Sequence, residues 1–204
     1  MNLNEMNIEQ LTEHIAEAMT VLRRKAYGEG YKQGKFDAEM DGLIGKYGGG
    51  ETAQEARDRI VEQAKNDIEE IKKYLGLSYV QFVINKEKRT IVALIKRVTS
   101  RNVESKGKAK CNPDDCFNVH IGKVIALRRA LGLEVPDEYL NAPHPTEVRV
   151  GDVVKNTRHN YVETVVKIQG NKMYYNDREY DFTYFINDER MKIIDDSRED
   201  VTNK

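Results

Sequence analysis

The chain has 204 residues, lacks tryptophan, and contains only two cysteines and four prolines. Two cysteines are too few for a disulfide framework, and they fit a reducing compartment. No apolar run approaches the ~20 residues that cross a membrane, and the acidic, polar start MNLNEMNIEQ does not read as a signal peptide. We therefore expect a soluble, cytoplasmic protein with no membrane partner.

Catalytic motifs are also missing. There is no G-x-S-x-G, no P-loop and no H-E-x-x-H. Asp114 and Asp115 are adjacent carboxylates, and neighbours on a turn point apart, so they do not suit general acid–base chemistry in a shared cleft. We expect a protein that is not an enzyme and needs no cofactor.

A metal site has weak support in the sequence. Cys111 and Cys116 are spaced C-x4-C with His120 nearby, but structural zinc needs four ligands and no second pair follows. His144 and His159 stand apart from them in the sequence. We favour two small buried cysteines that frame a turn, and we expect no metal.

Charge is unevenly distributed along the chain, although the net charge is only −1. Residues 1–78 have a net charge of −4, residues 79–131 of +8, and residues 132–204 of −5. A basic middle between two acidic ends is the strongest functional signal in the sequence.

The candidate ligand-binding residues are the cations of this basic middle. Lys106, Lys108 and Lys110 alternate at period two, so a strand would place all three on one face. Two interpretations stay open: the cations bind an anionic ligand, or they pair with the acidic ends of the same or another chain. The anionic ligand would be nucleic acid or a phosphorylated small molecule. The full candidate set is Arg89, Arg97, Arg101, Lys106, Lys108, Lys110, Lys123, Arg128 and Arg129.

Residues 1–78 predict an antiparallel helical hairpin. Asn7 with Gln10, and Thr52 with Glu55, resemble capping boxes that open two helices, and the glycines at 48–50 separate them. Each helix has a narrow apolar stripe at 3-4 spacing, which favours a homo-oligomer as well as a hairpin. The stripes are Ile8, Leu11, Ile15, Ala18 and Leu22, then Val61, Ala64, Ile68, Ile71 and Leu75.

Residues 79–132 predict a small β-β-β-α domain. The strands are expected at 79–84, 90–95 and 103–110, with a turn at Pro113 and a helix that Asn118 caps, that runs to Leu131 and that Gly132 stops. The aromatic residues Tyr79, Phe82 and Phe117 are expected in the core rather than as platforms for base stacking.

The rest of the chain predicts a linker and a small β module. Residues 133–147 hold three of the four prolines and read as an ordered linker. Five short strand-like runs over 148–196, with a Gly170-Asn171 hairpin signal, resemble an SH3-like or KOW-like barrel, and 197–204 form a polar tail. The fold class is therefore α+β.

Several stretches resemble accessory proteins of phages and prophages of Gram-positive bacteria, a group without an established activity. The stretches are YGEGYKQGKFDAEMDG, INKEKRTIVALIK, PTEVRVGDVV and, most specifically, a Cys-Asn-Pro-Asp-Asp turn followed by IGK-x-IALRRALG. The resemblance implies a phage gene that acts in the host cytoplasm, and it assigns no functional residues. The first Thoeris anti-defence family, which sequesters a cyclic nucleotide in an oligomer, is an analogy whose ligand residues do not match here.

We therefore expect a non-enzymatic binding protein that sequesters a phosphorylated or nucleotide ligand through its basic surface, and so counters a host defence or process. The alternatives are an inhibitor or adaptor of a host protein, or a nucleic-acid-binding accessory protein.

Overall fold

The computed structural model describes residues 51–170, 172–175, 178–181 and 190–198, together with positions 6, 7, 10, 11, 14, 17, 18, 21, 22, 25 and 28. The described positions from 10 to 28 are helical. The predicted capping box is present, since the Asn7 N–H donates to Gln10 Oε1 (3.0 Å) and the Gln10 N–H to Asn7 Oδ1 (2.9 Å). The predicted loop at 48–50, and with it the hairpin, lies outside the described residues.

Helix α2 spans Ala53–Lys73 and begins with the predicted capping box. The Glu55 N–H donates to the Thr52 hydroxyl, and the Thr52 N–H donates back to the Glu55 carboxylate. The apolar stripe is the buried face of this helix: Ile60, Ala64, Ile68 and Ile71 lie inside, followed by Leu75. The other face holds exposed Lys–Glu pairs, so α2 is amphipathic as its sequence predicts.

Three antiparallel strands follow, in the order β1-β2-β3: β1 Ser78–Asn85, β2 Thr90–Arg97 and β3 Val103–Lys110. Their positions confirm the predicted strands. Alternation at period two divides the sheet into two faces. Ile91, Ala93 and Ile95 of β2 are fully buried on the inner face, whereas the side chains between them are only half-buried.

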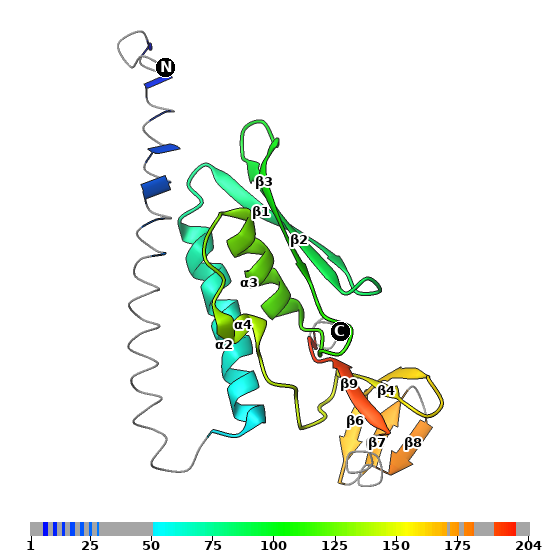
Figure 1. Cartoon of the computed structure of the whole chain (residues 1–204). Helices are drawn as coiled ribbons and strands as arrows, with labels where there is room; N and C mark the ends of the chain where they lie inside the picture. The colour runs from blue at the N-terminus through cyan, green and yellow to red at the C-terminus, as the bar shows by residue number, and fades with distance from the viewer. Residues whose placement is uncertain are drawn as a thin grey trace.

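Helix α3 (Val119–Ala130) covers the inner face of the sheet, and α2 packs against α3 (Figure 1). The predicted cap is present, because Asn118 Oδ1 accepts the N–H groups of His120 and Ile121. At Gly107 of β3 the helix comes so close that a Cβ would meet backbone atoms of Ala126 and Ala130. Residues of α2, the sheet and α3 share one hydrophobic core. The predicted boundary after residue 78, between the helical hairpin and the β-β-β-α domain, therefore passes through this core.

The proline-rich linker is ordered along α2, as predicted, and contains the short helix α4 (Asp137–Leu140). The Gln54 side chain accepts the N–H groups of Thr146 and Glu147, at 2.8 and 2.9 Å. The Tyr139 hydroxyl donates to Asp67 Oδ2 at 2.9 Å. These hydrogen bonds hold the linker against α2.

The C-terminal module consists of short strands around a second, smaller core. One sheet has the order β5-β4-β9 and the other β6-β7-β8. The core includes Val154, Val165, Met173 and Tyr175. The strands are β4 Val153–Asn156, β5 Val162–Thr164, β6 Lys167–Gln169, β7 Lys172–Tyr175, β8 Arg178–Asp181 and β9 Met191–Asp195.

The described strands do not close into the predicted SH3-like or KOW-like barrel. The described strands pair as two separate three-stranded sheets, whereas a barrel needs continuous pairing around its circumference. The hairpin signal is confirmed, because β6 pairs with β7 across Gly170, whose φ is +56°. Within the described part of the chain, no helix is long and apolar enough to cross a membrane.

Candidate functional site

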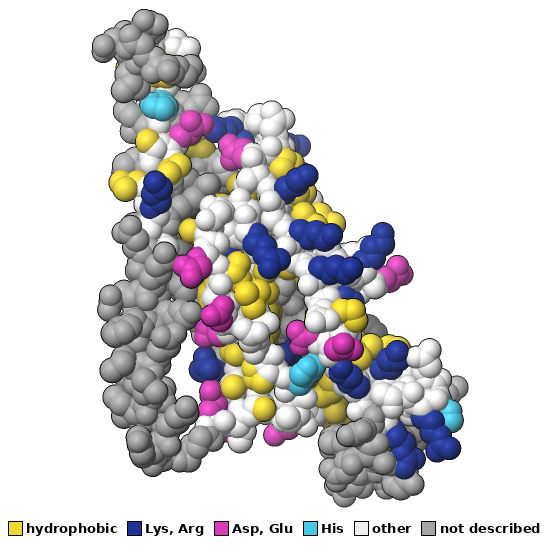
Figure 2. Space-filling view, viewed as in Figure 1, with side chains coloured by type: hydrophobic (Ala, Val, Ile, Leu, Met, Phe, Trp, Pro, Cys, Tyr) yellow, Lys and Arg dark blue, Asp and Glu magenta, His cyan; other side chains and the backbone are white. Residues whose placement is uncertain are grey.

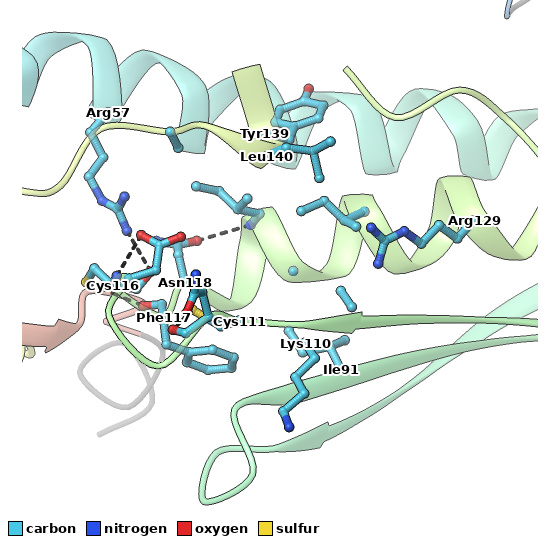
Figure 3. A pocket seen from close by; sticks show the side chains of 17 residues that line it. Arg57, Ile91, Lys110, Cys111, Cys116, Phe117, Asn118, Arg129, Tyr139 and Leu140 are labelled. Atoms are coloured by element: carbon cyan, nitrogen blue, oxygen red, sulfur yellow. Dashed lines mark hydrogen bonds between the residues drawn. The ribbon is translucent and has the colours of Figure 1, made fainter. Parts of the chain in front are cut away.

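A cavity of about 180 Å³ lies between α3, the end of β3 and the linker (Figure 3). Its walls are mostly apolar side chains from all three elements. Polar groups stand at its two ends: Arg129 at one, and the turn after β3 at the other. The apolar lining includes Ile91, Ala109, Phe117, Ile121, Ile125 and Leu140.

The turn after β3 is held in place by Arg89, one of the predicted ligand-binding residues. The Arg89 guanidinium donates to the carbonyl oxygens of Pro113 (2.8 Å) and Asp115 (2.5 Å) and to Cys111 Sγ (3.1 Å). The Asp115 N–H donates to the Asn112 carbonyl at 3.1 Å, which is the turn that the Pro-Asp-Asp sequence predicts. Arg89 therefore positions the cavity wall through three contacts of its own.

The deep end of the cavity rests on a buried ion pair between Arg57 and Asp196. Their side chains are 1% and 3% exposed, with Nε–Oδ2 and Nη2–Oδ1 distances of 2.6 and 2.9 Å. Arg57 also donates to the carbonyl oxygens of Pro143 and Cys116. Burial raises the pKa of Asp196, but the hydrogen bonds and charge of Arg57 outweigh burial and hold that pKa below its ordinary value of 3.8.

Arg129 is the cation at the open end. It is exposed on α3, and Figure 3 shows its guanidinium extending along the cavity. Its Nη1 donates to the Lys108 carbonyl at 2.7 Å, which fixes the side chain against β3. Among the described residues it has no other side-chain partner. The Nε and Nη2 edge is therefore free for two parallel hydrogen bonds to an anion.

Both cysteines lie at the cavity. Cys111 is half-buried and Cys116 is buried. Burial raises the pKa of each thiol, so both are protonated and poorly nucleophilic near neutral pH. They line the cavity as small, weakly polar groups.

Three further predicted ligand-binding residues have structural partners. Arg128 is 1% exposed and pairs with Asp67 at 2.7 Å, so it joins α3 to α2 inside the core. Arg97 pairs with Glu104 at 2.9 Å and Glu17 at 2.6 Å. The Lys123 ammonium lies 5.9 Å from the centre of the Phe82 ring. Arg101, another predicted ligand-binding residue, lies in the turn between β2 and β3 and has a positive φ of +57°.

Lys106, Lys108 and Lys110 lie on the outer face of the sheet, as their period-two spacing predicts. All three are exposed, and Figure 3 shows Lys110 extending away from the cavity. Arg129 reaches the cavity from the opposite side of β3. The nine predicted cations therefore do not converge on one point: Arg129 lies at the cavity, Arg89 holds the turn at its other end, the three lysines lie on the outer face with Lys110 at the cavity edge, and the remaining four are placed elsewhere.

Sequence reasoning missed Arg57, Asn118 and the linker residues as parts of this site. A signal for Arg57 was available, because it lies three residues before Ile60 and so falls in phase with the apolar stripe of α2. A charged residue at a buried helical position needs a buried partner. Its partner, Asp196, is 139 residues away in sequence and no local pattern identifies it.

The chain was compared with protein-family models, curated proteins and solved structures, and none of them matches it.

Proposed function

We propose that this chain is a phage accessory protein that binds and sequesters a phosphorylated, ring-containing ligand of the nucleotide class without chemical conversion. In this proposal the ring enters the apolar cavity and the phosphate contacts Arg129. The observation that carries the proposal is the combination, in one cavity, of an apolar wall with a guanidinium whose Nε and Nη2 edge is free.

The size of the cavity supports a single ring as the buried part. A cavity of about 150 Å³ is large enough to hold benzene, and this cavity measures about 180 Å³. A base-sized group fits it, while the sugar and phosphate remain outside at Arg129. Arg129 offers the planar fork that suits phosphate oxygens.

The test is calorimetric titration of the full chain with a set of nucleoside monophosphates and the matching nucleosides. A monophosphate that binds should lose about 10- to 100-fold in affinity in Arg129→Gln, since one charge-assisted hydrogen-bonding group contributes about 1.5–3 kcal/mol. The matching nucleoside should bind weakly and equally to both proteins. Ala142 of the linker also lines the cavity, so Ala142→Leu, which narrows it, should weaken the binding of both ligands.

Equal phosphate affinity in the wild type and Arg129→Gln would remove Arg129 as the anchor. Absence of binding for the whole set at millimolar concentration would contradict the proposed ligand class.

A second candidate function, a partner-binding or self-associating protein, has its own observation. Val21 and Leu22 on the N-terminal helical positions are 48% and 60% exposed. Exposed apolar side chains on a helix favour a homo-oligomer or a host-protein partner. Light scattering on the full chain tests the first of these directly.

A further inference from the structure

The outer face of the sheet is a second surface, which meets the cavity only at Lys110, the last residue of β3. Helix α3 lies against the inner face, so no described element covers the outer one (Figure 1). Its side chains form parallel rows across the three strands. Lys106, Lys108 and Lys110 on β3 lie opposite Leu94, Val92 and Thr90 on β2, and beyond these lie Gln81, Val83 and Asn85 on β1.

The lysine row is unpaired, in contrast to cations elsewhere. On α2, Lys65, Lys72 and Lys73 each pair with a glutamate three residues earlier. Lys106, Lys108 and Lys110 have no ion pair or side-chain hydrogen bond with the part of the chain that the structure describes. Figure 2 shows Lys and Arg side chains following one another over the middle of the molecule. The positive charge of residues 79–131 is therefore not neutralised on this face.

The shape of the face selects an extended ligand. Alternate residues of a strand are about 7 Å apart, so the three ammonium groups form a straight, evenly spaced row. Small-molecule sites are concave and enclose most of the ligand. Lys108 and Lys110 line a wide, open pocket together with Arg89 and Thr90, but Lys106 lies beyond that pocket on the sheet face. A linear polyanion contacts all three lysines at once.

Apolar side chains beside the lysines set a second requirement for the ligand of this face. Val83 is 48% exposed and Tyr79 is 38% exposed, and both point to this face together with the half-buried Val92 and Leu94. Single-stranded nucleic acid offers both phosphates for a cationic row and unpaired bases for an adjacent apolar surface. A duplex keeps its bases stacked inside, and an acidic peptide offers charge without rings.

We propose that the outer face of β1–β3 binds single-stranded nucleic acid, with the phosphates on Lys106, Lys108 and Lys110 and the bases on the apolar rows of β1 and β2. This inference does not depend on the cavity ligand, because Arg129 approaches from the other side of the sheet. It assigns a role to Lys106 and Lys108, which do not line the cavity, and to the ammonium group of Lys110, which lies at its edge and extends away from it.

The test is fluorescence anisotropy with a labelled oligo-dT of about 12 nucleotides and the full chain, over about 50 to 300 mM salt. Three phosphate contacts on a single strand predict a slope of about −2 for log affinity against log salt. The triple variant Lys106→Gln, Lys108→Gln, Lys110→Gln should flatten that slope and lower affinity more than tenfold at low salt, about tenfold being 1.4 kcal/mol. Tyr79→Ala with Val83→Ser should weaken binding and leave the slope unchanged.

The matched control is Lys65→Gln, Lys72→Gln, Lys73→Gln, which removes the same charge from α2 and should leave binding nearly intact. Circular dichroism on every variant confirms the fold. Equal losses in the two triple variants would overturn the proposal, as would an absence of oligonucleotide binding by the wild type. Competition by polyglutamate as effective as that by unlabelled oligo-dT would assign the face to an acidic protein instead.

Discussion

Arg57 of α2 and Asp196, the residue after β9, form a bidentate ion pair inside the molecule, with both side chains at most 3% exposed. The Asn118 amide donates to the same Asp196 carboxylate at 2.9 Å. One carboxylate therefore joins α2, the start of α3 and the end of the C-terminal sheet.

Asp196→Asn should destabilise the protein by about 3–5 kcal/mol near neutral pH, because it leaves Arg57 charged and buried. The pKa of Asp196 is held below its ordinary value of 3.8 in the folded state. The stabilisation that ionised Asp196 provides is therefore complete above pH 3.8, and it is lost as pH falls from there through the lower pKa of the folded state. The difference in Tm between wild type and Asp196→Asn should therefore be constant from about pH 7 to 5 and shrink below about pH 4. Asp152 is present in both proteins; burial and the charge of Asp196 raise its pKa, so Asp196→Asn removes the second of these effects. A constant difference down to pH 3 would contradict this account.

Gly107→Ala should lower the free energy of unfolding by at least about 1–3 kcal/mol. The added methyl group meets backbone atoms of α3, and backbone cannot move aside as a flexible side chain can. Lys106→Ala, one residue earlier on the exposed face, is the control and should change the free energy of unfolding by less than about 0.5 kcal/mol. Urea denaturation measures both. Similar values for the two variants would mean that α3 does not approach β3 this closely.

Asn118→Ala should cost more than Thr52→Ala, although both remove a helix cap. Loss of the Thr52 cap, which is exposed, should cost about 1 kcal/mol. Asn118 additionally donates to buried Asp196, so its loss should cost at least about 2 kcal/mol. Unfolding by urea compares the two, and equal costs would show that the Asn118–Asp196 bond contributes little.

Local patterns predicted most of the secondary structure. Both described capping boxes, the α2 stripe, the three strands of the first sheet and the Asn118 cap follow from side chains a few residues apart, which sequence spacing records. Long-range placement was not predictable in the same way. Nothing near Arg129 indicates that it faces a cavity while Lys108 faces the opposite side, because that depends on how α3 crosses β3 at Gly107. The barrel expectation was wrong for the described strands because strand spacing does not fix how short sheets close.

Thiol labelling gives an independent view of the cavity. Near pH 8, Cys111 should react more slowly than a free thiol because burial raises its pKa, and Cys116 should react only after unfolding. A ligand in the cavity should slow Cys111 labelling further, since Cys111 lines its wall. Rates measured with a chromogenic disulfide, with and without a bound nucleotide, test this. Unchanged labelling at saturating ligand would place the ligand elsewhere.

Self-association should depend on the exposed N-terminal apolar pair. We expect a homo-oligomer at tens of micromolar, and Leu22→Asp should dissociate it while leaving the core of α2, the sheet and α3 folded. Light scattering gives the mass, with His14→Gln, at another exposed position of the same helix, as the control. A monomeric wild type at that concentration would remove the second candidate function.

The position of Asp196 has a consequence for how the protein is made. Arg57 emerges from the ribosome 139 residues before its counter-ion. Until the end of β9 has been synthesised, Arg57 lacks its counter-ion, so closing α2 on α3 during translation would bury an unpaired charge. A premature stop codon upstream of Asp196 should therefore yield a product that proteases degrade, even though it retains both helices and the first sheet.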